Sequence, residues 1–232
     1  MPKITPGPDI RIAAMEKKKV ELANLMQPGA GTPWEDRGST GAIKAFFATC
    51  VMGLKSPVKL LSSIRRPETP SDARGFMIGC GVMWGIGAIV QSVLLRLHWG
   101  ADWEPDGFRI GVAVLAILSV VIVYLMHALA TAMLTKMNSV ELGARAPSVL
   151  TYNVLSYVLS PSLLAPIPVI GPAVAGIWIV CLGIVACTRR LKLKVATAII
   201  NVLLTTVVVL LCVSVMLLVA RLLFGGIMRY FD

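Results

Sequence analysis

Histidine and cysteine are the residues of this chain best suited to acid–base, nucleophilic or metal chemistry. The two histidines, His98 and His127, lie near opposite membrane surfaces in the topology derived below, so they do not predict a shared metal site. The five cysteines form no CxxC pair, and four lie in apolar runs, where a thiol packs as a small hydrophobe. No zinc-protease, nucleophile-elbow or phosphate-loop motif is present. The sequence therefore predicts no enzyme, no metal site and no cofactor.

A row of polar side chains inside one apolar run is the other candidate site. Asn153, Ser156, Tyr157 and Ser160 recur at three- and four-residue steps, which places them on one face of a helix. Such a polar seam either lines a cavity for a solute or hydrogen-bonds to neighbouring helices. No acidic residue lies in any apolar run, whereas ion and proton pathways usually contain one. A pump or proton-coupled carrier is therefore disfavoured.

The elements that would position these residues are membrane spans. Apolar residues make up 56% of the chain, charged residues 15%, and the mean hydropathy is +0.80; soluble domains average about 25% charged residues. About 20 apolar residues cross a bilayer. We predict an all-α fold, a polytopic helical membrane bundle with five transmembrane helices over residues 75–97, 109–134, 148–165, 169–188 and 195–224. The third is the weakest because Pro161 interrupts it, and the third and fourth form either two crossings or a re-entrant hairpin.

Basic residues set the predicted orientation. Loops on the side of the N-terminus carry eleven lysines and arginines near the spans, against four on the other side. By the positive-inside rule this places the N-terminus in the cytoplasm and the C-terminus outside. The net charge of +10 lies before and between apolar runs, so it indicates contact with the lipid bilayer and its anionic headgroups and not with nucleic acid.

Residues 39–70 are predicted to form amphipathic interfacial helices, between a mobile or marginally helical cytoplasmic segment (1–38) and the membrane domain (71–232). Apolar side chains that include Phe46 and Phe47 recur on one arc of a helix, flanked by Lys55 and Lys59. This pattern is typical of a helix in the membrane interface, and the alternative is a helix packed on the bundle or on a partner protein. Ser56-Pro57 predicts a break and a restart. Beyond the first span, Trp99 and Trp103 suit an interfacial aromatic belt.

Glycine pairs in the first span predict close helix packing. Gly75 with Gly79 and Gly81 with Gly85 are GxxxG pairs, which allow helix backbones to approach closely in lipid. They support either packing within the chain or formation of a homo-oligomer.

Four pieces of the sequence carry a family resemblance. They are Pro33-Trp34-Glu35-Asp36-Arg37 with the apolar helix and Ser56-Pro57 after it, His127 with Leu142-Gly143, Tyr152 through Ser160-Pro161 to Gly171, and Ile177-Trp178 with Leu182-Gly183-Ile184. In this order the chain resembles the Yip family (Ypt/Rab-interacting proteins), in particular its compact bacterial-type members. The resemblance implies five spans, a cytoplasmic N-terminus and no catalytic residue. In eukaryotic members it implies vesicle traffic, small-GTPase contact and membrane shaping.

Together these features predict a non-enzymatic integral membrane protein that organises the membrane or scaffolds an unknown membrane or cytoplasmic partner. The alternative is a small-solute or lipid permease that uses the polar seam. We expect it in a bacterial inner membrane, because the chain is compact and contains neither the Asp-Leu-Tyr-Gly-Pro-like segment of eukaryotic Yip proteins nor an Asn-x-Ser/Thr sequon.

Overall fold

The computed structural model describes residues 29–65, 71–99, 105–142 and 148–231. Most of the predicted segment 1–38, together with Trp103 and the side chain of Trp99, lies outside the described residues. Every regular element in the described ranges is a helix, which confirms the all-α fold. The elements are α2 (Arg37–Thr40), α3 (Ala42–Lys55), α4 (Pro57–Ser63), α5 (Ser71–Trp99), α6 (Pro105–Leu142), α7 (Ser148–Val158), the 3-10 helix η1 (Ser160–Leu164), α8 (Gly171–Arg189) and α9 (Val195–Phe231).

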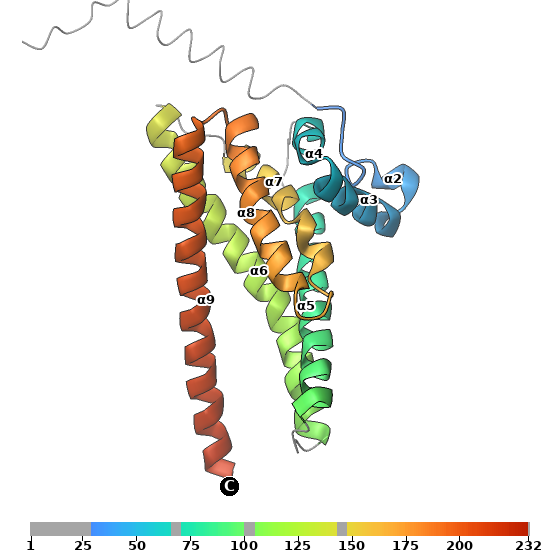
Figure 1. Ribbon diagram of the computed structural model, residues 1–232, viewed down its shortest axis with the longest axis vertical. Coiled ribbons are helices and arrows are strands. Elements are labelled where there is room, and N and C mark those ends of the chain that lie inside the picture. Colours follow the sequence, from blue (N-terminus) through green and yellow to red (C-terminus); the bar gives the residue numbers. More distant parts are fainter. Residues whose placement is uncertain (1–28, 66–70, 100–104, 143–147, 232) are drawn as a thin grey trace, which may run out of the picture.

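Four of these helices are long and apolar enough to cross a bilayer. The candidate spans are Ala73–Leu94 in α5, Ala116–Met137 in α6, Gly171–Arg189 in α8 and Val195–Val215 in α9. Each contains 19 to 22 residues, which matches the thickness of the hydrocarbon layer. The chain is therefore an integral membrane protein. Figure 1 shows α2, α3 and α4 gathered near one end of the long helices, while α9 runs to the opposite end.

The third of the five predicted transmembrane helices, residues 148–165, is not confirmed as a span. In its place α7 has 11 residues and is followed by the five-residue η1, which has Pro161 in its first turn. Proline cannot donate a backbone hydrogen bond in the middle of a helix, so α7 ends before it and the chain continues as a 3-10 turn. At about 1.5 Å per residue, α7 alone is about 16 Å long, too short to span the hydrocarbon layer.

The α7–η1 segment and α8 form a hairpin beside α5. At its turn, the Gln91 side chain donates to the carbonyl of Ile167 (3.1 Å) and accepts from the backbone N–H of Val169 (3.1 Å). Gln91 lies 18 residues beyond Ala73, the first residue of the α5 span, which corresponds to about 27 Å of helix. The hairpin therefore extends along most of the apolar length of α5.

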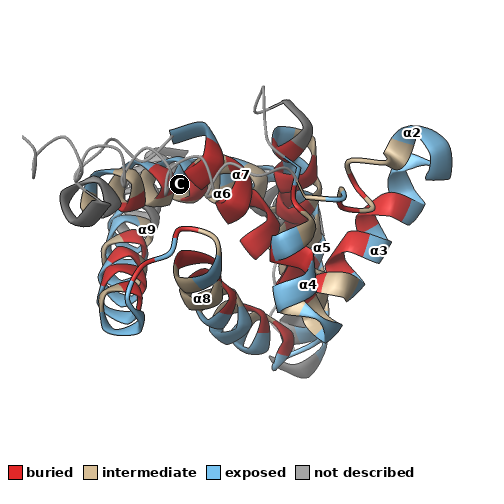
Figure 2. Cartoon of the chain, turned by 90° about the horizontal axis from the view of Figure 1, so that it is seen from above, coloured by how far each residue is buried: buried red, intermediate tan, exposed pale blue. Residues whose placement is uncertain are grey.

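The interior of the bundle surrounds α7. Eight of its 11 residues are buried, against α5, α6 and α8. Figure 2 shows buried residues along α7 and exposed residues on the outward faces of α3, α8 and α9. Because α7 is enclosed by other helices, its buried polar side chains contact protein and not the surroundings of the bundle.

The short helices at the end of the bundle follow local sequence signals. Gly41 has a φ of 83°, a value that a residue with a side chain rarely adopts, and it separates α2 from α3. The predicted break at Ser56-Pro57 is confirmed, because α3 ends at Lys55 and α4 begins with Pro57. Proline is favoured at the first position of a helix, where its missing N–H is not needed.

Candidate functional site

The outer surface of α3 and α4 is the first candidate site. The structure divides the predicted apolar arc into two faces. On the inner face Phe46 is only 8% exposed, and its ring centroid lies 5.3 Å from that of Phe76 in α5. On the outer face Ile43 is 77% exposed and Phe47 44%, with Val51 and Val58 also exposed. Of the two predicted interface aromatics, Phe47 therefore faces outward and Phe46 packs in the core.

Lysines surround this outer face. Lys44, Lys55 and Lys59 are all exposed. We call the set Ile43, Phe47, Val51, Val58, Lys44, Lys55 and Lys59 the α3–α4 outer face. It combines apolar and cationic side chains, and it contains only the outward part of the predicted apolar arc.

Contacts with α5 fix the position of α3 along the bundle. A Cβ atom on Gly79 would lie 2.7 Å from the Phe46 ring, and one on Gly75 would lie 3.1 Å from the Trp34 ring. Gly79 is six residues beyond Ala73, where the apolar span of α5 begins, so α3 lies about 9 Å along that span. The absence of side chains at both glycines lets the two aromatic rings approach the α5 backbone.

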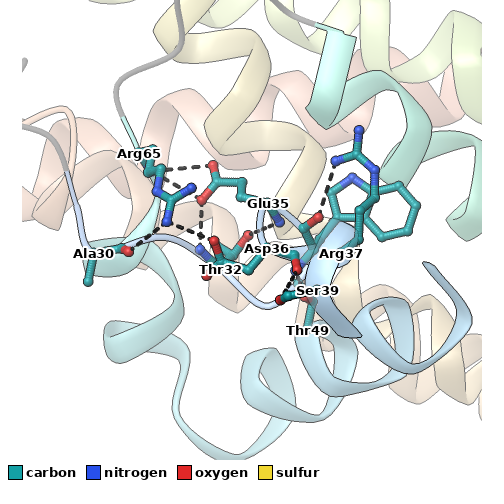
Figure 3. Close-up of polar contacts among 9 residues, drawn as sticks. Ala30, Thr32, Glu35, Asp36, Arg37, Ser39, Thr49 and Arg65 are labelled. Carbon is teal, nitrogen blue, oxygen red and sulfur yellow. Dashed lines mark hydrogen bonds and ion pairs between the residues drawn. The ribbon is translucent and has the colours of Figure 1, made fainter. Parts of the chain in front are cut away.

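Residues 32–36 form a folded turn that holds Trp34 against α3, and sequence reasoning missed it (Figure 3). The backbone N–H of Thr32 donates to Glu35 Oε2 (2.6 Å), and the backbone N–H of Glu35 donates to Thr32 Oγ1 (3.3 Å). This reciprocal pair is a capping box. The Trp34 N–H donates to Thr49 Oγ1 in α3 (2.9 Å). The predicted segment boundary at residue 38 therefore falls inside a folded unit, and Thr-x-x-Glu was the signal available in the sequence.

The same turn is attached to the end of α4. The N–H of Gly31 donates to the carbonyl of Ser63 (2.7 Å), and that of Gly29 to the carbonyl of Ile64 (3.2 Å). Gly31 has a φ of 106°, and a Cβ on Gly29 would lie 2.5 Å from the Ser63 backbone, so both positions require glycine. The chain before α2 and the chain after α4 are thus joined.

Arg65 adds charged contacts to this junction (Figure 3). Its guanidinium donates to Asp36 Oδ1 (2.7 Å) and to the carbonyl of Ala30 (3.3 Å), and its backbone N–H lies 3.3 Å from both Glu35 carboxylate oxygens. The Arg65–Asp36 pair is about half exposed, and such ion pairs contribute about 0–1 kcal/mol. The Arg65–Asp36 pair therefore fixes the orientation of the turn but adds little to its stability.

Arg190, at the end of α8, connects α8 to α4. Its guanidinium donates to the carbonyl of Ile64 (3.0 Å). Burial lowers the pKa of Arg190, and the negative charge of Glu35 opposes that shift. This contact brings the C-terminal end of α8 to the same end of the bundle as α4.

The polar seam of α7 is the second candidate site. All four predicted residues, Asn153, Ser156, Tyr157 and Ser160, are buried. Ser156 Oγ lies 3.0 Å from His127 Nε2 on α6, and His127 Nε2 lies 3.2 Å from the carbonyl of Tyr152. The sequence did not connect His127 to the seam, because the two lie on different helices.

Members of the seam contact different neighbours. Ser156 faces His127 on α6, while Ser160 packs against Gly53 of α3, with no room for a side chain at Gly53. Asn153 Oδ1, Ser160 Oγ and His127 Nδ1 are buried and have no hydrogen-bond partner among the described residues. The seam therefore joins α7 to its neighbours and also contains unsatisfied polar atoms.

The predicted glycine pairs lie at contacts within the chain. A Cβ on Gly85 would lie 2.9 Å from the Ala116 carbonyl oxygen of α6, and one on Gly81 would lie 3.2 Å from the Val120 Cα. Gly75 and Gly79 face Trp34 and Phe46, as described above. All four glycines thus permit close packing inside one copy of the chain.

Comparisons with known proteins add no relative. No protein-family model matches the chain, and neither the curated proteins nor the solved structures give a match.

Proposed function

We propose that this protein is a non-enzymatic membrane organiser or scaffold of Yip type, which acts through the α3–α4 outer face. The observation that carries the proposal is the exposure of Ile43, Phe47, Val51 and Val58 beside three exposed lysines. A helix with this composition binds the boundary between headgroups and acyl chains, about 5–10 Å deep. Its contact with Gly79, six residues into the α5 span, supports that depth.

The energies favour a bilayer as the surface that covers this face. Full burial of a large apolar side chain contributes about 1.5–3 kcal/mol, so covering the exposed parts of these four side chains contributes roughly 4 kcal/mol in total. Each lysine near an anionic membrane surface adds about 1 kcal/mol. The capping box and the Arg65 contacts hold the unit in place, so little conformational entropy is lost when it binds.

The orientation that goes with this proposal has the α3–α4 outer face in the cytoplasmic leaflet, with a bacterial inner membrane as the host. The excess of lysine and arginine near the spans on that side supports it. A protein partner would contact the same face in place of lipid.

Photocrosslinking of the full chain in native membranes tests this function. A benzophenone amino acid at Phe47 is expected to capture lipid or one defined protein, because this side chain faces outward. The matched control places the same group at Phe46, whose inward position should give products within the chain only. Lipid capture supports membrane shaping, and capture of one protein supports scaffolding. Identical intramolecular products at both positions would contradict the proposal.

A second candidate function is a permease for a small solute or lipid through the polar seam. The observation in its favour is that buried Asn153 Oδ1 and Ser160 Oγ have no partner among the described residues, although unsatisfied polar atoms are costly in lipid. Replacing Asn153 with Leu should abolish solute flux into proteoliposomes if the seam is a path. Unchanged photocrosslinking from Phe47 in the same variant would show that the scaffold surface does not depend on the seam.

A further inference from the structure

Three basic side chains, one at the end of α8 and two in the turn to α9, point away from the rest of the described chain. Arg189, Lys192 and Lys194 are exposed. In the described ranges, no side-chain hydrogen bond or ion pair links any of the three to another residue. Arg190, between them, instead turns inward to the carbonyl of Ile64. The turn therefore carries a cluster of positive charge that is free to bind an external anion.

The backbone of this turn is held in one conformation. Leu191 and Leu193 are buried, and their N–H groups donate to the carbonyls of Ala186 (3.2 Å) and Cys187 (3.1 Å) in the last turns of α8. Lys192 between them has a φ of 56°, which is uncommon for a residue with a side chain and persists where the surroundings fix it. Alternation of buried leucine with exposed lysine thus directs Lys192 and Lys194 away from the bundle.

An apolar surface continues directly from these cations. Val195, Ile199 and Ile200 are exposed on the first turns of α9, which is one of the candidate membrane spans. The turn joins two such spans, so it lies where a span meets the polar layer of the membrane. An anionic phospholipid has its phosphate at the membrane surface and its acyl chains below. Its phosphate would therefore meet these cations, and its acyl chains would meet the apolar face of α9.

We propose that Arg189, Lys192 and Lys194 bind the headgroup of an anionic phospholipid whose acyl chains lie along Val195, Ile199 and Ile200 of α9. Basic residues near a membrane surface contribute about 1 kcal/mol each, which corresponds to about fivefold in affinity per residue. This site is separate from the α3–α4 outer face, so a negative result for one surface does not contradict the proposal for the other.

The test uses the full chain in bilayer nanodiscs that contain a phosphatidylglycerol with a photoreactive acyl chain, and mass spectrometry maps the labelled residues. The variant combines Arg189→Gln, Lys192→Asn and Lys194→Gln; asparagine is chosen because it tolerates a positive φ. The matched control, Lys44→Gln with Lys55→Gln and Lys59→Gln, removes the same charge from the α3–α4 outer face.

The proposal predicts labelling within residues 195–200 that falls more than about tenfold in the triple variant, while labelling of the candidate span in α5 is retained and reports that the chain is folded. The single variant Lys192→Asn should reduce the labelling about fivefold. In the control variant, labelling of residues 195–200 should persist. Equal labelling by photoreactive phosphatidylcholine, or undiminished labelling in the triple variant, would overturn the proposal. Loss of labelling with excess inorganic phosphate would assign the site to a free anion and also overturn it.

Discussion

The hydroxyl of Thr49 is the acceptor for the buried N–H of Trp34, and its removal tests how the α3–α4 unit is held. Thr49 is fully buried, and the hydrogen bond is 2.9 Å long. Thr49→Val keeps the shape of the side chain but removes the oxygen that accepts from the Trp34 N–H. Removing one partner of a buried hydrogen bond costs about 1–3 kcal/mol. We therefore expect the docked form of residues 31–37 to lose about 2 kcal/mol, a change of about 30-fold in its opening equilibrium.

Hydrogen–deuterium exchange of the full chain in nanodiscs measures this opening. Peptides that cover residues 31–37 should exchange about 30-fold faster in Thr49→Val, because exchange follows local opening. Thr49→Ser keeps the oxygen and loses one methyl group, about 0.8 kcal/mol, so its exchange should rise only about fourfold. Thr206→Val, which removes a hydroxyl bonded within α9, is the matched control and should leave these peptides unchanged. Equal exchange in Thr49→Val and the native chain would refute this account of the turn.

Three further changes probe other contacts. Glu35→Gln removes the negative charge near Arg190 and weakens the capping box, so trypsin should cleave after Arg37 severalfold faster than in the native chain; an unchanged rate would contradict this role. Gly85→Leu places a side chain against the α6 backbone and should strongly reduce the yield of folded protein, whereas Gly176→Leu, where a Cβ meets nothing within 4 Å, should not. Ser156→Ala removes a partner of His127 and should lower stability in a denaturant titration by about 1 kcal/mol; no change would argue against the seam as a helix contact.

The membrane class and most helix positions follow from the sequence alone. Long apolar runs predict spans because about 20 such residues are needed to cross lipid with every backbone group satisfied. Four of the five predicted spans correspond to helices of suitable length and composition. The break at Ser56-Pro57 was also predictable, because proline acts on its own residue and its immediate neighbours.

The third segment shows where hydropathy alone is insufficient. Its apolar content predicted a span, but Pro161 divides it into α7 and a 3-10 turn, and neighbouring helices bury it. Hydropathy does not distinguish a segment enclosed by protein from one exposed to lipid, because both exclude water. The packing of α5, α6 and α8 around α7 shows that this segment is enclosed by protein.

The division of α3 into two faces was also decided by tertiary structure. Periodicity placed Phe46 and Phe47 on one apolar arc, but it did not specify which part of the arc would meet α5. Gly79 provides the space that Phe46 occupies, and Thr49 receives the Trp34 N–H, across separations of 33 and 15 residues. Likewise, Arg190 reaches Ile64 across 126 residues. The sequence determined which segments are helical and apolar, because those properties are local. The tertiary structure determined which side chains remain exposed, because exposure depends on neighbours that are distant in the chain.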